Sequence, residues 1–236
     1  MSIEADSPRG IAGSEAGRRV RTFFSRVEGR LKLGLAKRTV RYGLRRDLTV
    51  PIERPSAKIP ISVREVQKED LAVLLPEDTS MYSEQDRLEI VWRKRFAADV
   101  GSKGCYVAID ERDGSPCYMQ WLLAPSQNEV IRRLGGFPQL QKGEALLENA
   151  YTPPTHRGLG IMSAAMALIA ERGEDVNARY VITFVGEDNI ASLKGCRRAG
   201  FAPDMLHIRQ DYLFGIVRRH RFEPLPADDP RRNWEL

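Results

Sequence analysis

The residues best placed for chemistry form the segment Arg157-Gly158-Leu159-Gly160-Ile161-Met162, which the flanking sequence puts between a strand and a helix. Glycines let the chain turn sharply and let a ligand come close to the main chain. The first N–H groups of a helix have no partner within it and lie at the positive end of its dipole, so they suit a phosphate or pyrophosphate. The segment therefore predicts an anion-binding loop, and a Gly-rich turn without a ligand is the other interpretation.

Two common nucleotide-binding loops do not fit this segment. The GxGxxG pattern of dinucleotide-binding folds is missing, and the segment lacks the Gly-Lys-Ser/Thr of a P-loop. The three cysteines have no CxxC spacing, and the three histidines are scattered along the chain, so we predict reduced thiols and no metal site.

The loop is the first half of a longer pattern. An apolar strand and then a second motif follow it, and the two motifs read Thr152-x-Pro154-x-x-Arg157-Gly158-x-Gly160-Ile161 and Asn189-x-x-Ser192-x-x-x-Cys196-x-x-x-Gly200-Phe201. Together they resemble the bacterial type of the GNAT superfamily, the acyl-CoA-dependent N-acetyltransferases. The resemblance extends from Ile61 to about Phe222.

The resemblance implies that the pantetheine arm of acetyl-CoA lies between two diverging strands and that the pyrophosphate lies on the loop amides. Acetyl-CoA is then a co-substrate, and no metal is needed. The main chain at Ala150, Tyr151 and Thr152 would hold the arm, and Asn189 and Ser192 would contact it from the next helix. The loop residues that would hold the pyrophosphate are Arg157, Gly158, Leu159, Gly160, Ile161 and Met162.

The resemblance also implies direct acyl transfer to a primary amine of a small molecule, within a ternary complex. Leu146 occupies the strand position where the family often has a glutamate base. Glu148 lies two residues later on the same strand, so it is the candidate base. Alternation would put both residues on one face of the strand, together with Ala150 and Thr152. An idle ion-paired carboxylate is the other interpretation of Glu148.

Two further positions depart from the family pattern. Cys196 stands where the family often has a tyrosine that protonates the departing thiolate, so it is a candidate proton donor or a packing residue. Met162 stands where the loop usually has Gly or Ala. These departures keep open a second function, a catalytically silent acyl-CoA-binding module that the basic N-terminal segment tethers to a membrane or a protein.

The elements that must position these residues alternate along the chain. Period-2 or wholly apolar runs predict strands at 61–66, 104–110, 116–124, 144–152, 178–185 and 207–222. Helical patterns cover 68–75, 83–100, 160–173 and 188–200. The predicted fold is α/β (α+β), with a mixed, mostly antiparallel central sheet that splays between the fourth and fifth of these strands and helices on both faces.

Composition sets the remaining expectations. The chain has 236 residues, with 42% hydrophobic and 29% charged residues, and no apolar run approaches the roughly 18 residues of a membrane span. The first residues also lack the pattern of a secretory leader, so we expect a cytoplasmic protein. The predicted organisation is a disordered N-terminus (1–16), a basic amphipathic helical segment (17–48), a Pro-rich linker (49–60), the acyltransferase domain (61–222) and a loose C-terminal tail (223–236).

The basic segment explains the net charge of +5, with eleven basic residues against two acidic ones between Arg18 and Asp47. A helix docked on the domain or on a dimer partner is the preferred interpretation, and weak contact of residues 18–46 with an anionic membrane is the second. We do not expect a nucleic-acid partner, because the domain has no basic stripe. On this organisation, deletion of residues 1–48 should spare CoA binding.

The acceptor would lie opposite the CoA arm, among the first helices, the central hairpin and the last strands. Residues there could line its pocket or belong to the core. The candidates are Tyr82, Trp92, Tyr118, Gln120, Trp121, Asp211 and Tyr212.

Overall fold

The computed structural model describes residues 34–234. In chain order its strands and α-helices are β1 (Ala36–Asp47), β2 (Ile61–Glu65), α2 (Lys68–Leu74), α3 (Glu84–Val100), β3 (Cys105–Asp110), β4 (Pro116–Leu123), α4 (Asn128–Leu134), β5 (Glu144–Tyr151), α5 (Ile161–Glu171), β6 (Tyr180–Gly186), α6 (Ile190–Arg198), β7 (Ala202–Tyr212) and β8 (Val217–Pro224).

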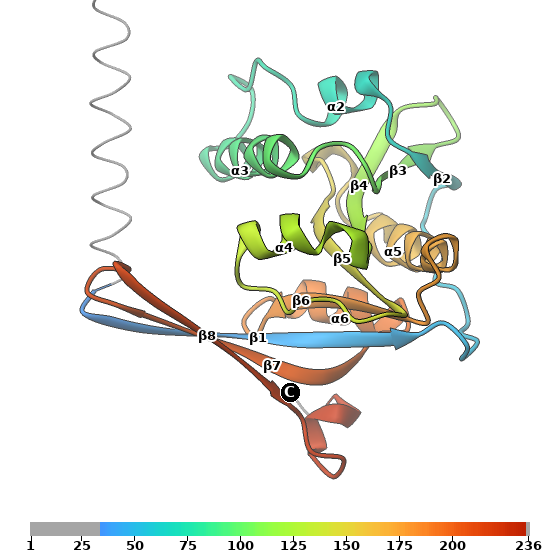
Figure 1. The fold of residues 1–236 in the computed structure, drawn as a ribbon. Helices are drawn as coiled ribbons and strands as arrows, with labels where there is room; N and C mark the ends of the chain where they lie inside the picture. The colour runs from blue at the N-terminus through green and yellow to red at the C-terminus, as the bar shows by residue number, and fades with distance from the viewer. Residues whose placement is uncertain (1–33, 235–236) are drawn as a thin grey trace, which may run out of the picture. The chain divides into compact units, whose positions relative to one another are not determined.

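The strands form one sheet in the order β2-β3-β4-β5-β6-β1-β7-β8 (Figure 1). β2–β3, β3–β4, β4–β5 and β6–β1 pair antiparallel, whereas β5 and β6 pair parallel. The predicted fold class, a mixed and mostly antiparallel sheet with helices, is confirmed. The chain forms two compact units, a main unit of 40–208 and 221–236 and a hairpin unit whose described residues are 34–39 and 209–220.

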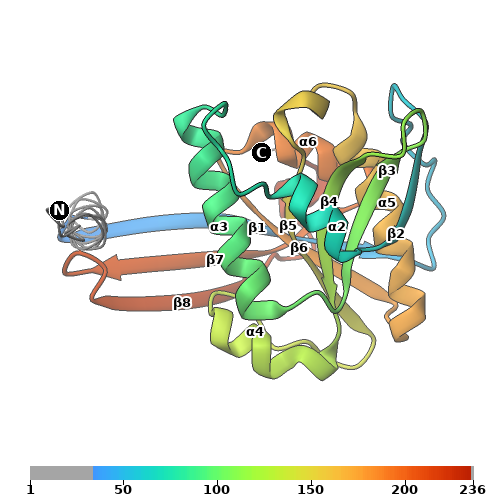
Figure 2. The ribbon, with the colours of Figure 1, turned by 90° about the horizontal axis from the view of Figure 1, so that it is seen from above.

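Helices cover both faces of the sheet in the main unit. α5 and α6 pack on one face, where Ile161, Ile169 and Leu193 join the core. On the other face, Leu74 from α2, Ile90 from α3 and Ile131 from α4 form a second core with the opposite side of the strands. Figure 2 shows the helices from above. Both faces are buried, which explains the nearly continuous apolar sequence of β6.

Local signals set the ends of the helices as the sequence predicts. The Ser83 side chain accepts from Asp86 N at 3.1 Å and so caps α3, which ends before Gly101, a residue with φ of +82°. Asn189 caps α6 in the same way by accepting from Ser192 N at 3.1 Å. These caps place both functional helices at their expected starts.

The helical prediction for residues 17–48 is wrong where the structure describes it. Residues 36–47 form strand β1, which lies between β6 and β7, and residues 17–33 fall outside the described part of the chain. Val40, Tyr42 and Leu44 are buried at a period of two, which is the spacing of a strand. Gly43 fits this strand because an added Cβ would lie 2.4 Å from Met205 Cγ. The sheet therefore begins at Ala36, before the predicted domain start at Ile61.

Both segments predicted to flank the domain loosely pack on it within the main unit. Residues 49–60 have no helix or strand, yet Ile59 is buried and Lys58 N donates to Leu159 O at 2.8 Å. In the predicted tail, Leu225 is buried and the Arg232 Nε–H donates to Pro226 O at 2.8 Å. The expectation of a loose tail is wrong for residues 223–234, because Leu225 joins the core.

The hairpin unit consists of strand ends around a tight turn. Leu213, Phe214 and Gly215 all have positive φ, and Leu213 N donates to Leu35 O at 2.9 Å. Asp211 is fully buried between Arg209 and Arg218, at 2.8 and 2.9 Å. No helix within residues 34–234 is both long enough and apolar enough to cross a membrane.

Candidate active site

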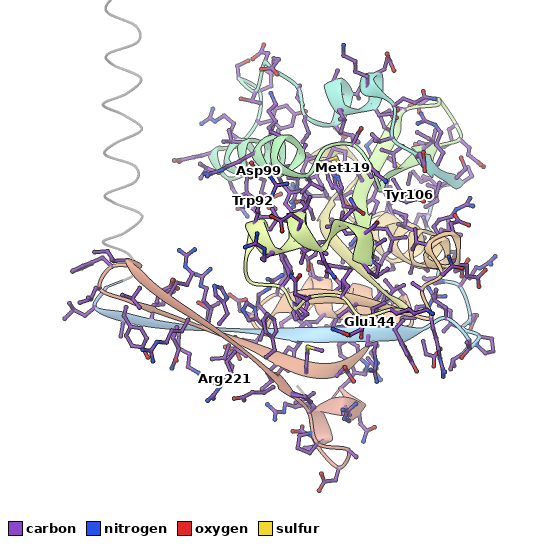
Figure 3. All side chains as sticks on the ribbon, in the orientation of Figure 1. Trp92, Asp99, Tyr106, Met119, Glu144 and Arg221 are labelled. Carbon is purple, nitrogen blue, oxygen red and sulfur yellow. The ribbon has the colours of Figure 1, made fainter. Side chains whose placement is uncertain are left out.

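The site is built where β5 and β6 separate. Their main-chain pairing extends only from Glu144 and Tyr180 to Leu146 and Ile182. Beyond this last main-chain pair, the Glu148 side chain bridges the two strands, because its Oε1 accepts a hydrogen bond from Phe184 N at 2.9 Å. Figure 1 shows β5 and β6 at an angle to each other, with Glu144 labelled at the start of β5 in Figure 3. The predicted splay lies between these two strands.

A bulge in β5 changes the direction of the side chains after Glu148. Trp121 of β4 pairs with Glu148 and Met119 with Tyr151, so β5 has one residue more than β4 in this stretch. Asn149 has φ of +63°, in the left-handed region. As a result Tyr151 joins the core on the side of Leu146, while Ala150 packs against the opposite core. The expected common face of Glu148, Ala150 and Thr152 is wrong, because the bulge interrupts the alternation.

The predicted CoA-binding residues gather around one cleft of about 640 Å³, which we call the loop cleft. It lies between the end of β5, the Gly-rich loop and the starts of α5 and α6. Leu159 is the exception among them: it packs against the core beneath. The predicted residues that line the loop cleft are Ala150, Tyr151, Thr152, Arg157, Gly158, Gly160, Ile161, Met162, Asn189 and Ser192.

The loop presents main-chain donors to this cleft. Gly158 and Gly160 have φ of +77° and +74°, a conformation that glycine adopts without strain. The first amide of α5 that bonds back along the chain is that of Ala164, which donates to Gly160 O at 3.4 Å. The amides of Ile161, Met162 and Ser163 come before it in α5. Such first amides of a helix have no partner within the helix and can bind a ligand. The Met162 side chain lies toward α6, where a Cβ added at Gly195 would be 3.2 Å from it, so Met162 does not displace these donors.

Arg157 already has partners on α3. Its Nη1 lies 2.7 Å from Asp86 Oδ1, its Nη2 lies 3.5 Å from Glu89 Oε2, and its Nε–H donates to Thr152 O at 3.2 Å. Hydrogen bonding from Ser83 and then the ion pair with Arg157 lower the pKa of Asp86. Arg157 is 45% exposed, so a phosphate in the cleft would compete with these carboxylates for it.

The two predicted catalytic residues line a second cavity of about 280 Å³, which we call the inner cavity. It adjoins the loop cleft, because Arg93, Ala150, Met162, Asn189 and Ser192 line both. Burial raises the pKa of Glu148, and Arg41 opposes this shift from 3.3 Å. Burial and then the charge of Glu148 raise the pKa of Cys196 to about 12. Glu148 is thus a carboxylate of increased basicity, and Cys196 is a protonated thiol.

Four polar residues of the inner cavity are missing from the predicted site: Arg41, Arg93, Asn149 and Thr183. Arg41 lies on β1, which the sequence reading took for a helix, and its Nη2–H donates to Phe184 O at 2.9 Å. Arg93 lies one residue after Trp92 on α3, and its Nη1–H donates to Asn149 Oδ1 at 2.6 Å. Of these residues, the sequence could have indicated Asn149. Asparagine is disfavoured in strands, and a polar residue inside an apolar strand is typical of a bulge.

The predicted acceptor residues divide among several environments. Trp92, labelled in Figure 3, and Gln120 line the inner cavity, and Tyr118 lines the loop cleft. Trp121 and Tyr82 belong to the core. Asp211 and Tyr212 lie in the hairpin unit. Within residues 34–234, no group of three or more His, Cys, Asp or Glu side chains could hold a metal ion.

The comparison with known families decides the relationship. Residues 77–201, more than half of the chain, match the sequence model of the acetyltransferase (GNAT) family. The chain belongs to the GNAT acetyltransferase family. The matched residues include α3, the β5 bulge, the Gly-rich loop and α6, so the GNAT match covers the loop cleft and all of the inner cavity except Arg41.

Solved structures with similar folds include other GNAT proteins. The glucosamine N-acetyltransferase region of a fungal multi-domain β-N-acetylglucosaminidase is 13% identical, with a TM-score of 0.50, and the match covers 87% of this chain and 23% of that one. A GNAT acetyltransferase from Colwellia psychrerythraea is 14% identical, with a TM-score of 0.46 and coverage of 81% and 57%. A putative acetyltransferase from Salmonella typhimurium, solved with its cofactor acetyl-CoA, is 14% identical, with a TM-score of 0.41 and coverage of 71% and 94%.

The chain thus spans 57% of the length of the Colwellia psychrerythraea protein. No curated protein matches the sequence.

Proposed function

We propose that the protein is an N-acyltransferase that moves an acetyl or other short acyl group from acyl-CoA to a primary amine of a small molecule. The observation that carries the proposal is the continuity of the two cavities. The loop cleft offers helix-start amides, and the inner cavity next to it offers a buried carboxylate. A pyrophosphate-bearing donor and an amine therefore have adjoining sites.

The residues of the loop cleft fit acetyl-CoA. Gly158 and Gly160 let a phosphate approach the amides up to Met162, and Asn189 and Ser192 border the path toward β5. Bound there, acetyl-CoA supplies an activated acyl thioester. Asn149 N donates to Glu148 Oε2 at 3.4 Å, and Ala150 has no partner in the β4 register, so the bulge leaves the main chain at Ala150 for the pantetheine arm and for a developing oxyanion.

Within the inner cavity, Glu148 is the proposed base. An amine must lose a proton before it attacks the thioester, and a carboxylate of raised pKa takes that proton more readily. Glu148 also has the structural role of bridging to Phe184 N, and the two roles use different electron pairs. Transfer is direct, within a ternary complex.

The CoA thiolate that leaves must also receive a proton, and Cys196 is the predicted donor. Cys196 has a pKa of about 12, whereas an ordinary thiol has a pKa near 8.5, so donation from Cys196 would be uphill. Its role as proton donor stays a prediction that its burial opposes. Water entering from the loop cleft is the simpler source.

The experiment that tests the proposal is thiol release from acetyl-CoA with a panel of small amines, together with calorimetric titration of CoA. Amine-dependent thiol release and measurable CoA binding support it. CoA binding without thiol release from any amine would leave the second function, a silent acyl-CoA-binding module. No CoA binding by the folded protein would overturn both.

One observation favours the membrane tether that belongs to the second function, the silent acyl-CoA-binding module. The hairpin unit exposes Leu35 just before β1, and Leu213 and Ile216 in the turn between β7 and β8, at 70%, 53% and 69%, next to Lys37 and Arg218 on the strands. Apolar and basic side chains together suit an anionic membrane surface. Sedimentation with vesicles rich in phosphatidylserine, against vesicles of phosphatidylcholine, tests this contact. A homodimer and a cytoplasmic location stay predictions.

A further inference from the structure

The inner cavity contains a mostly buried cation, Arg93, whose ion pair is long. The Arg93 side chain is 14% exposed, and the nearest carboxylate oxygen is Glu89 Oε2 at 3.9 Å. Glu89 is also 3.5 Å from Arg157, so two guanidinium groups share it. A mostly buried guanidinium needs a partner, because removing its hydration is costly.

Nearby donors are also unsatisfied. Arg93 Nε and Asn149 Nδ2 are buried and have no hydrogen-bond partner. Because Arg93 Nη1–H donates to Asn149 Oδ1 at 2.6 Å, the Asn149 amide is oriented with its Nδ2 donors directed elsewhere. Arg93 stacks between the rings of Trp92 and Tyr151, at 5.5 and 5.0 Å, which fixes the guanidinium in place. A buried donor without an acceptor destabilises the folded protein, so a site that keeps two of them is suited to an acceptor-rich ligand.

Arg41 adds a second positive charge to the same cavity. It pairs with Glu148 at 3.3 Å, and its guanidinium lies over the rings of Phe137 and Phe184. Glu148 therefore has Arg41 as its partner, whereas Arg93 has the long ion pair with Glu89 and the hydrogen bond to Asn149 Oδ1. The cavity can offer one carboxylate to an amine and, at Arg93 Nε, an unsatisfied guanidinium donor to an anion.

We propose that the acceptor amine carries a carboxylate, which Arg93 and Asn149 Nδ2 bind while the amine faces Glu148. This inference rests on the proposed function. A guanidinium beside an amide donor matches the two oxygens of a carboxylate. The cavity of about 280 Å³ is at the small end for ligand sites, so the acceptor is a compact amino acid.

The test compares matched acceptors. Each of the common amino acids is assayed by thiol release from acetyl-CoA beside its carboxamide and its decarboxylated amine. Loss of a charge-assisted hydrogen bond should lower kcat/KM by about 10- to 100-fold for the best acceptor. Equal rates with and without the carboxylate would overturn the inference and leave the proposed function standing. No thiol release from these amines, while another small amine is acetylated, would overturn the inference alone, and no thiol release from any small amine would overturn both.

Two variants locate the carboxylate. Arg93→Met should raise the KM of the amino acid at least tenfold, raise the KM of acetyl-CoA by less than that, and abolish the preference over the carboxamide. Asn149→Gly keeps the left-handed backbone and removes the whole side-chain amide, both its Nδ2 donors and the Oδ1 that accepts from Arg93, so it should weaken the same preference even if Arg93→Met does not fold. Arg133→Met, the same change on the exposed face of α4, is the control and should behave as wild type. A raised KM for acetyl-CoA with an unchanged preference would assign these donors to the thioester and overturn the inference.

Discussion

Glu148 Oε1 accepts a hydrogen bond from Phe184 N at 2.9 Å, just beyond the last main-chain pair of β5 and β6. The side chain thus replaces a ladder bond in the opening between the strands. Because the same carboxylate bridges the opening and is the proposed base, a substitution at Glu148 can change both stability and turnover, and both must be measured.

Glu148→Gln should lower turnover by about 100-fold or more, since it removes the proposed base. The glutamine amide oxygen can still accept from Phe184 N, so the fold and the affinity for acetyl-CoA should be kept. Initial rates of thiol release and calorimetry measure the two effects. Glu129→Gln, on the exposed ion pair with Arg132, is the control. Unchanged turnover would exclude Glu148 as the base.

The pH dependence of activity should report the same carboxylate. Burial raises the pKa of Glu148 above its usual 4.5, and only the ionised form can accept a proton. The logarithm of kcat/KM should therefore rise with pH through an inflection above 4.5 that disappears in Glu148→Gln. An identical acidic limb in both proteins would assign the inflection to another group.

The stability that Glu148 contributes should change with pH in the opposite direction. Its folded pKa is raised, so between the usual 4.5 and that raised pKa the folded state binds more protons than the unfolded state. The free energy of unfolding of wild type relative to Glu148→Gln should be highest below pH 4.5 and fall as pH rises through this window. Urea unfolding across the pH range measures it. A relative stability that increases with pH would show that the ion pair with Arg41 outweighs burial.

The Gly-rich loop can be tested with a matched pair of glycines. Gly158 and Gly114 both have φ of +77°, and a Cβ added at either meets no atom within 4 Å. Alanine should cost each variant about 1–2 kcal/mol of unfolding free energy. Only Gly158→Ala should weaken acetyl-CoA binding, by about tenfold, because its Cβ enters the loop cleft. Equal affinities in the two variants would place the pyrophosphate elsewhere.

Cys196→Ala tests the other catalytic candidate. The thiol is fully buried with a pKa of about 12, so its loss should cost about 1–2 kcal/mol of stability and change turnover less than threefold. In the folded wild type this thiol should also resist alkylation at neutral pH, as mass spectrometry would show. A stably folded Cys196→Ala protein without turnover would make the thiol the proton donor.

Deletion of residues 1–48 should now prevent folding, contrary to the expectation from the sequence. It removes β1, which pairs with β6 from Arg41 to Asp47 and buries Leu44 completely. Deletion of residues 1–33 leaves β1 whole and should keep acetyl-CoA binding. Circular dichroism melting and calorimetry compare the two. Cooperative melting after the longer deletion would show that β1 is dispensable.

The sequence by itself determined the loop, the caps and most of the strand and helix order. These features depend on neighbouring residues: Gly158 and Gly160 permit the turn, Ser83 and Asn189 cap the helices that follow them, and alternation identifies β2. Local chemistry of this kind is readable without the fold. It carried the family resemblance and the fold class.

Tertiary structure alone decided the rest. β1 reads as helical until its partner β6 buries Val40, Tyr42 and Leu44, because a strand depends on a neighbour far away in the chain. The bulge at Asn149 depends on the register with β4, and it redirects Tyr151. Arg41, Arg93 and Glu148 meet from three distant segments, and only their shared burial in the inner cavity makes one of these cations available to a ligand.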